Sequence, residues 1–223
     1  MNTEMAKVNE KFQALNGSMT DPRTRRYLVP KRIVLTKGDV KDPETLLVEK
    51  SNQITLVTGP HCTLENHKGQ PNAAVLVDFG IEFSGSARLM IWGVRGRNNR
   101  ADILVRFGES VSEAMTPIFE KNTTNDHAIR DRVMNVGFLS ANETNESGYR
   151  FAYIELLEEE GLVELKSIQG VFAYRDLEYK GSFECSDELI TKIWDTAAYT
   201  AHLNMQEYLW DGIKRDRLVW IGD

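Results

Sequence analysis

The class of fold follows from residues 88–107, which read RLMIWGVRGRNNRADILVRF. Two apolar runs, Arg88 to Trp92 and Asp102 to Phe107, flank a segment rich in Gly and Asn, from Gly93 to Asn99. Runs of Val, Ile, Leu and aromatic residues bounded by turn residues are typical of β-strands. Gly and Asn favour the backbone conformations of turns. The stretch therefore predicts two antiparallel strands joined by a loop.

Runs of the same kind recur on both sides of this hairpin. A polar, irregular stretch at 109–132 separates those before it from those after it. Many short strands with turn signals and no helical run between them predict an antiparallel β-sandwich over residues 27–180. Residues 1–26 are polar and mixed in charge, and we expect a leader or arm there. The strands are predicted at Tyr27–Leu35, Gln53–Thr58, Ala73–Phe79, Ala87–Gly93, Ala101–Gly108, Val133–Leu139, Tyr149–Leu157, Val163–Ile168 and Val171–Leu177.

The hydrophobic period changes after Tyr179, where a helix is predicted. Ser186 and Asp187 offer an N-cap with acidic residues in the first turn. Apolar residues then recur at steps of three and four, which predicts an amphipathic helix running to about Gln206. A single helix must cover its apolar face with the sandwich, another chain or a helical domain beyond Asp223. The third arrangement is favoured, with residues 181–223 as the start of that domain. The apolar face comprises Leu189, Ile190, Ile193, Trp194, Ala197, Ala198 and Ala201.

Composition narrows the classes of function. The net charge is −6 with 27% charged residues, and the basic residues are dispersed, so no nucleic-acid partner is expected. No apolar run reaches the roughly 20 residues of a membrane span. The N-terminus lacks an apolar core segment, so the chain is cytoplasmic at face value, or periplasmic or secreted if an export signal was removed.

The four histidines show no metal-ligand spacing, and no cofactor is expected. Cys62 and Cys185 are predicted as free thiols, with a single disulfide as the alternative.

Residues 211–223, DGIKRDRLVWIGD, follow the predicted helix and are called the carboxylate segment below. Asp211, Asp216 and Asp223 are interleaved with basic residues and Trp220. Glycoside hydrolysis needs one carboxyl group to protonate the leaving oxygen and a second carboxylate to activate water or to attack. A tryptophan ring packs on the apolar side of a sugar. The alternative interpretation is a surface segment with weak salt bridges.

The carboxylate segment resembles the signature of α-L-rhamnosidases of glycoside hydrolase family 78. That signature runs roughly Asp-x-Pro-x-Arg, then an acidic residue and Arg, then x-x-Trp-x-Gly-Asp. Residues 181–187 with Ile193-Trp194 are similar to the family's entry into its catalytic domain. Residues 77–80, 88–89 and 105–110 are similar to β-domain segments. The resemblance implies that an (α/α)6 barrel follows the sandwich, that the chain holds its first helix, and that terminal α-L-rhamnose of a glycan or glycoside is hydrolysed with inversion.

The resemblance also implies roles for single residues. Asp216 falls on the position of the general acid. Asp211, Arg215, Trp220 and Asp223 fall on positions that bind or orient the sugar, while the general base belongs to a glutamate outside this chain. Two positions depart from the pattern: Ile213 replaces the usual proline, and Asp216 replaces the usual glutamate.

Two alternatives stay open. One is a non-catalytic carbohydrate-binding or structural sandwich, with the loop 93–99 and Trp92 as candidate contacts. The other is a family member that acts on another sugar or lacks activity.

Overall fold

A computed structural model describes residues 21–56, 58–121, 130–214 and 219. The chain is mainly β, and all strand pairs are antiparallel. The elements are β1 (Thr24–Leu28), β2 (Arg32–Lys37), β3 (Asp39–Lys41), η1 (Pro43–Leu47), β4 (Cys62–Glu65), β5 (Ala74–Arg95), η2 (Arg97–Asn99), β6 (Arg100–Gly108), α2 (Val111–Met115), β7 (Asp131–Gly137), β8 (Ser140–Glu143), β9 (Ser147–Leu156), β10 (Leu162–Tyr174) and α3 (Glu188–Asn204).

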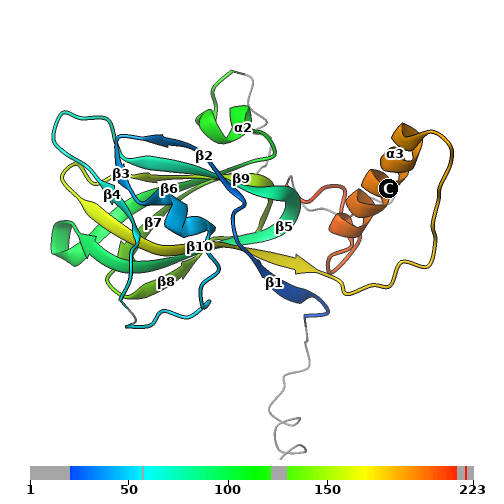
Figure 1. The fold of residues 1–223 in the computed structure, drawn as a ribbon, viewed down its shortest axis with the longest axis horizontal. Coiled ribbons are helices and arrows are strands. Elements are labelled where there is room, and N and C mark those ends of the chain that lie inside the picture. The colour runs from blue at the N-terminus through cyan, green and yellow to red at the C-terminus, as the bar shows by residue number, and fades with distance from the viewer. Residues whose placement is uncertain (1–20, 57, 122–129, 215–218, 220–223) are drawn as a thin grey trace, which may run out of the picture.

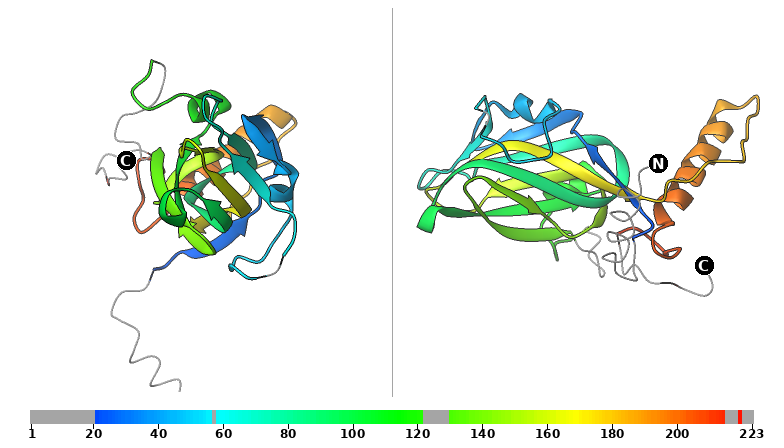
Figure 2. Two further views of the ribbon diagram at one scale, coloured as in Figure 1. Left: turned by 90° about the vertical axis from the view of Figure 1, so that its left-hand side faces the viewer. Right: turned by 90° about the horizontal axis from the view of Figure 1, so that it is seen from below.

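The strands form two layers that share one long strand, β5 (Figure 1). Residues 74–78 of β5 pair with β2 and β9, and β9 continues the first layer to β6 and β7. Residues 85–95 pair with β10, and residues 88–91 also pair with β8. In the second layer β10 in turn pairs with β4 and β1. Seen end-on, the strands surround a common interior (Figure 2), as in a β-sandwich.

The core lies between the two layers and follows the period of two that strands impose. In β5, Val75, Val77 and Phe79 point into it from one layer, and Leu89 and Ile91 from the other. A second, smaller cluster forms where α2 covers the outer face of the first layer. Its members are Ala74, Leu76, Ala114, Phe151 and Tyr153, with Val34, Leu35, Val111 and Met115 packed against them.

The structure confirms the antiparallel β class and the presence of strands on both sides of residues 93–99. These two strands do not pair with each other, because β9 lies between β5 and β6 in the sheet order. The structure also merges several predicted strands. Ala73–Phe79 and Ala87–Gly93 belong to β5, and Val163–Ile168 and most of Val171–Leu177 belong to β10. The breaks predicted at Gly80 and Gly170 are wrong, because both glycines lie within strands. Gly80, at φ +84, bends β5 without ending it.

Two local predictions are wrong. The described part of Gln53–Thr58 is not a strand, and the strand of this region is β4, after Pro60. Carbonyl and hydroxyl groups of Gln53 and Thr55 accept from the Lys166 ammonium rather than from a neighbouring strand. The stretch 109–132 also contains the helix α2. At the N-terminal end, β1 begins at Thr24, inside the stretch expected as an arm.

The bend in β5 is held by Asp78. Its carboxylate accepts two hydrogen bonds from Arg150, at 2.8 and 2.9 Å, and others from Arg32 and from the backbone N–H of Gly80. The Arg150 guanidinium, with Gly80 and Arg32, lowers the pKa of Asp78 to about 2. The Asp78 carboxylate therefore stays ionised near neutral pH, and the hydrogen bonds that hold the bend are kept.

Helix α3 lies beside one end of the sandwich (Figure 1). The side chain of Asp187 caps it by accepting from the N–H of Leu189. The Tyr199 hydroxyl donates to the carbonyl oxygen of Glu82 at 2.6 Å, and Nε2 of His202 lies 2.6 Å from the carbonyl oxygen of Arg175. These bonds attach the helix to the bend of β5 and to the end of β10.

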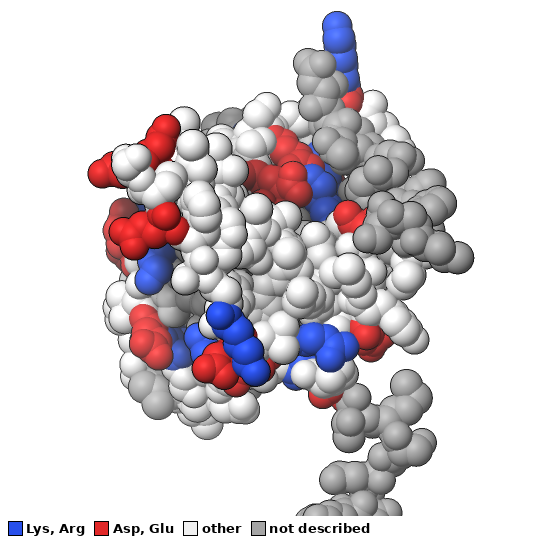
Figure 3. Space-filling view, turned by 90° about the vertical axis from the view of Figure 1, so that its right-hand side faces the viewer, with Lys and Arg blue, Asp and Glu red and all other residues white. Residues whose placement is uncertain are grey.

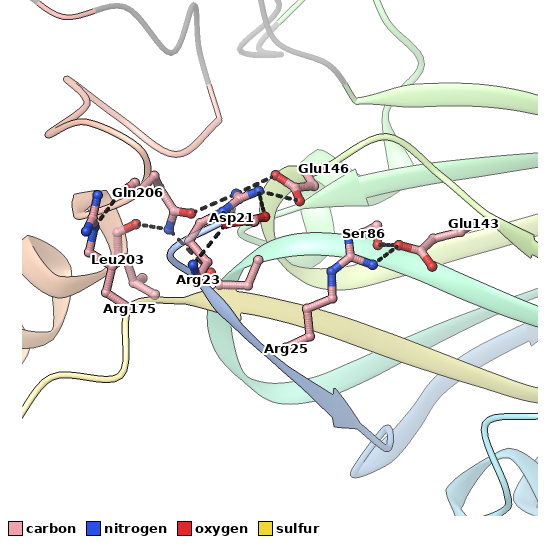
Figure 4. A network of polar contacts seen from close by, with 10 residues as sticks. Asp21, Arg23, Arg25, Ser86, Glu143, Glu146, Arg175, Leu203 and Gln206 are labelled. Atoms are coloured by element: carbon pink, nitrogen blue, oxygen red, sulfur yellow. Dashed lines mark hydrogen bonds and ion pairs between the residues drawn. The ribbon is translucent and has the colours of Figure 1, made fainter. Parts of the chain in front are cut away.

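A polar network connects the residues after α3 to the segment before β1 and to the end of β10 (Figure 4). Gln206 is fully buried, and its side-chain amide donates to the carbonyl oxygens of Ala173 and Leu203. Arg23 donates to the side-chain oxygen of Gln206 at 3.1 Å and pairs with Glu146 at 2.9 Å. The segment entering β1 thus fixes the residues that leave α3.

The apolar face of α3 is exposed. Leu189, Ile190 and Ile193 are 65%, 47% and 58% exposed, and Leu203 is the buried residue of the helix. This end of the molecule carries a broad field of uncharged side chains with charged groups around it (Figure 3). Burial of such a face removes apolar surface from water, so packing of another surface against α3 would be favourable.

Within the described residues, no helix combines the length and apolarity that crossing a bilayer demands. Both cysteines are free: Cys62 is buried and Cys185 is exposed.

Candidate functional site

The carboxylate segment begins by packing on the sandwich. Ile213 is 7% exposed and lies against Gly148 at the start of β9. A Cβ atom on Gly148 would stand 2.4 Å from Cγ1 of Ile213, far closer than van der Waals contact. Gly148 therefore leaves the room that Ile213 fills, and Ile213 replaces the proline expected at that position.

Lys214, the residue after Ile213, is held by ion pairs. Its ammonium is 2.8 Å from Oε1 of Glu113 and 3.1 Å from Oε2 of Glu109, and the residue is 6% exposed. Glu113 is itself held, because its carboxylate accepts from the N–H of Glu109 and its own N–H donates to the Ser110 hydroxyl. Charge-assisted bonds to a buried ammonium are strong and directional. The cap of α2 thus anchors residues 211–214, the described start of the carboxylate segment.

A third carboxyl group, that of Glu82, joins this anchor from the bend of β5. Burial raises its pKa to about 7, and the neighbouring charge of Glu109 and a hydrogen bond to that carboxylate add to the effect. Lys214 acts in the opposite direction. A hydrogen bond between two carboxyl groups requires a proton on one of them. Near neutral pH the pair of Glu82 and Glu109 therefore holds a proton beside Lys214.

We expect Glu82 to make stability depend on pH. The pKa of its carboxyl in the folded chain, about 7, lies above the ordinary value of 4.5. Its favourable contribution is therefore complete below about pH 4.5 and is lost as pH rises to 7. Urea unfolding of the full chain between pH 4.5 and 8 should show this decline, and Glu82→Gln, which retains a donor for Glu109, should reduce it.

The exposed turn residue Glu159 supplies the control, since Glu159→Gln should leave the decline intact. Parallel pH profiles for the wild type and Glu82→Gln would refute the assignment.

Asp211 is the one predicted site residue that the structure describes. It is partly buried, and its Oδ1 atom is buried with no hydrogen-bond partner among the described residues. A buried carboxylate oxygen without a partner is unfavourable in a folded protein unless something else supplies donors. Arg215, Asp216, Trp220 and Asp223 lie outside the described residues.

Sequence reasoning missed the anchor. The pattern Ser110-x-x-Glu113 is the signature of a capping box and would have indicated a helix start at this place. No sequence pattern pairs Lys214 with α2, because about 100 residues separate them and the pairing depends on the docking of Ile213. Glu82 was missed for the same reason.

Among the described residues, one further group has the spacing of metal ligands: Asp39, Glu65 and His67. Lys41 and Arg95 neutralise it, since the Lys41 ammonium is 3.3 Å and the Arg95 guanidinium 2.7 Å from oxygens of Glu65. The group is satisfied as a surface ion-pair network. Trp92 is half-buried and lies outside the core, with its ring 5.0 Å from that of His61.

No protein-family model matches the chain, and no curated protein matches its sequence. Solved structures do match its fold. A rhamnosidase from Klebsiella oxytoca with rhamnose bound is 17% identical over 97% of this chain, with a TM-score of 0.64. The GH78 family rhamnosidase of Bacillus sp. GL1 is 18% identical over 81%, with a TM-score of 0.58. An α-L-rhamnosidase from Dictyoglumus thermophilum is 23% identical over 72%, with a TM-score of 0.50.

The likeness to these proteins is one of fold. The match spans 41%, 17% and 18% of their respective chains, so this chain corresponds to a minor part of each.

Proposed function

We propose that this chain is part of an inverting glycoside hydrolase of the α-L-rhamnosidase type, which removes terminal α-L-rhamnose from glycans or glycosides. The observation that carries the proposal is the joint presence of two features. The fold matches that of a rhamnosidase over 97% of the chain. The carboxylate segment is fixed to that fold by Ile213 and Lys214.

The proposed roles follow the resemblance of the carboxylate segment. Asp216 donates its proton to the glycosidic oxygen as the bond to the sugar breaks. Asp211, Arg215, Trp220 and Asp223 bind and orient the sugar. The Oδ1 atom of Asp211 supports its role, because it has no hydrogen-bond partner among the described residues and a sugar hydroxyl would supply a donor.

The opposite face of the sugar requires a base that activates water. In inverting enzymes the two carboxyl groups lie about 6.5–9.5 Å apart, which leaves room for that water. We assign this base to a helical domain that covers the apolar face of α3. The exposed Leu189, Ile190 and Ile193 support such a domain, because its packing would remove them from water.

The test is hydrolysis of a methyl α-L-rhamnoside by the full-length protein, followed by NMR of the first sugar released. The proposal predicts β-L-rhamnose as the initial product, because a single displacement inverts the anomeric centre. Residues 1–223 alone should release no rhamnose, since the base is missing. Retention of configuration, or turnover by the fragment, would overturn the proposal.

A sandwich that binds carbohydrate without hydrolysing it is the second candidate function. A cavity whose lining residues lie outside the carboxylate segment favours a binding role for the sandwich. The loop 93–99 is less suited to binding, because the side chain of Arg100, the residue that follows the loop, is engaged with Asn135.

A further inference from the structure

A cavity of about 460 Å³ lies between the loop that joins η1 to β4 and the strand β10. The loop is drawn in cyan in Figure 1 and shares no residue with α3 or the carboxylate segment. A volume of this size is within the range of small-molecule sites. Nothing in the proposed hydrolysis uses this cavity.

Three basic side chains line the cavity: Lys50, His61 and Lys166. Lys166 is 6% exposed, and its ammonium donates to the carbonyl oxygen of Gln53 and to the Thr55 hydroxyl, both at 2.9 Å. The Lys50 ammonium donates to the carbonyl oxygen of Lys166 at 2.8 Å. Each of the two ammonium groups has three donors, so both keep donors for a further partner.

The charges of these groups repel one another. Burial lowers the pKa of Lys50, and the nearby charge of Lys166 lowers it further. Burial and the charge of Lys50 lower the pKa of His61, which Glu164 partly opposes. No acidic residue is among the described residues that line the cavity. An anion in the cavity would relieve this repulsion.

His61 adds an independent sign of a missing partner. Both of its ring nitrogens are shielded from solvent, and neither has a hydrogen-bond partner in the described part of the chain. Buried polar groups in folded proteins are normally paired, so the imidazole of His61 is a further unsatisfied polar group in the wall of the cavity. The Trp92 ring contacts the His61 ring, with 5.0 Å between their centroids.

The uncharged residues of the lining indicate which kind of anion fits the cavity. Hydroxyl side chains form the uncharged polar part of the lining, and Val48 and Pro60 contribute apolar surface. A sugar ring presents hydroxyl groups at its edge and C–H groups on its faces, which matches hydroxyls set in an apolar wall. The hydroxyl residues are Thr45, Ser51, Thr55 and Thr58.

We propose that this cavity binds an acidic sugar residue, with its carboxylate at Lys50 and Lys166 and its hydroxyls on the surrounding threonine and serine side chains. The sandwich would then hold a uronic acid unit of a glycan at a place apart from the carboxylate segment. The proposal does not depend on the hydrolytic activity, because it rests on other residues.

The experiment is a calorimetric titration of the full-length protein with sodium D-glucuronate, with D-glucose and sodium sulfate as comparison ligands. Saturable binding of glucuronate is expected, with at least tenfold weaker binding of both comparison ligands. Loss of a charge-assisted bond should make Lys50→Met bind glucuronate about tenfold or more weakly. The exposed Lys68 supplies the control, and Lys68→Met should bind as the wild type does.

Lys50→Met is the informative variant because Lys50 is only half-buried, whereas Lys166 supports the loop. Unfolding curves of both variants confirm that the fold is kept. Absence of glucuronate binding, equal affinity in Lys50→Met, or equal affinity for sulfate would each overturn the proposal. The last outcome would identify a plain anion site.

Discussion

Replacement of Asp216 by Asn in the full-length protein is expected to lower kcat/KM for methyl α-L-rhamnoside by about 10²–10⁴-fold, the usual contribution of a general acid. The amide has no proton to donate as the glycosidic bond breaks. A methoxide leaving group needs that proton, whereas p-nitrophenolate leaves readily without one. The loss should therefore be much smaller for p-nitrophenyl α-L-rhamnoside.

The difference between the two substrates separates catalysis from structural damage. A misfolded variant would lose both activities equally, and an acid-deficient variant would lose mainly the first. Asp216→Glu should retain the decline in rate at alkaline pH, because a carboxyl group is restored, and Asp216→Asn should lose it. Asp176→Asn, at an exposed carboxylate after β10, serves as the matched control. Equal rates for Asp216→Asn and the wild type on both substrates would remove Asp216 from the mechanism.

Replacement of Lys214 by Met should release the carboxylate segment from the sandwich. The ammonium is buried between Glu109 and Glu113, and its removal leaves two carboxylates together beside Glu82. Breaking a buried pair by removing one partner costs about 3–5 kcal/mol. We expect a loss of unfolding free energy of this order, or local opening that appears as faster hydrogen exchange at residues 205–214.

The packing half of the anchor can be tested separately with Gly148→Ala. Its new Cβ would meet Ile213 at 2.4 Å, whereas a Cβ at Gly212 would meet nothing within 4 Å. Gly212→Ala is therefore the control. Lys214→Met and Gly148→Ala loosen the same segment, so the double variant should lose less stability than the two single losses added together. Full additivity, or unchanged exchange in Lys214→Met, would show that the segment is held elsewhere.

The β class of the fold was predictable because short-range patterns specify it. Runs of apolar and aromatic residues bounded by turn residues predicted strands at 101–108 and 149–157, close to the observed bounds of β6 and β9. The predicted breaks failed where the tertiary structure decides the outcome. Gly80 reads as a turn in a sequence window, yet Asp78 and its two arginines hold that point as a bend inside a strand.

The candidate site was less predictable than the fold. Asp211 was identified from a motif, whereas the burial of its Oδ1 atom without a partner among residues 21–56, 58–121, 130–214 and 219 is a property of the folded chain that no motif contains. Lys214 appeared as one of several interleaved charges, which usually make weak surface pairs. Its burial between two glutamates depends on Gly148 and α2, which are distant in sequence. The basic cavity is similarly built from residues more than 100 positions apart, such as Lys50 and Lys166.

The continuity of β5 has a consequence for how the sandwich loses its structure. Its 22 residues give hydrogen bonds to both layers, so neither layer has a full set of neighbours when the other is disrupted. Such sharing makes the two layers one cooperative unit, and partial unfolding is unfavourable on either side. A break in the backbone near the bend would separate the layers and expose unpaired strand edges, which are templates for aggregation. Proteolysis at that point would therefore yield insoluble material rather than two soluble halves.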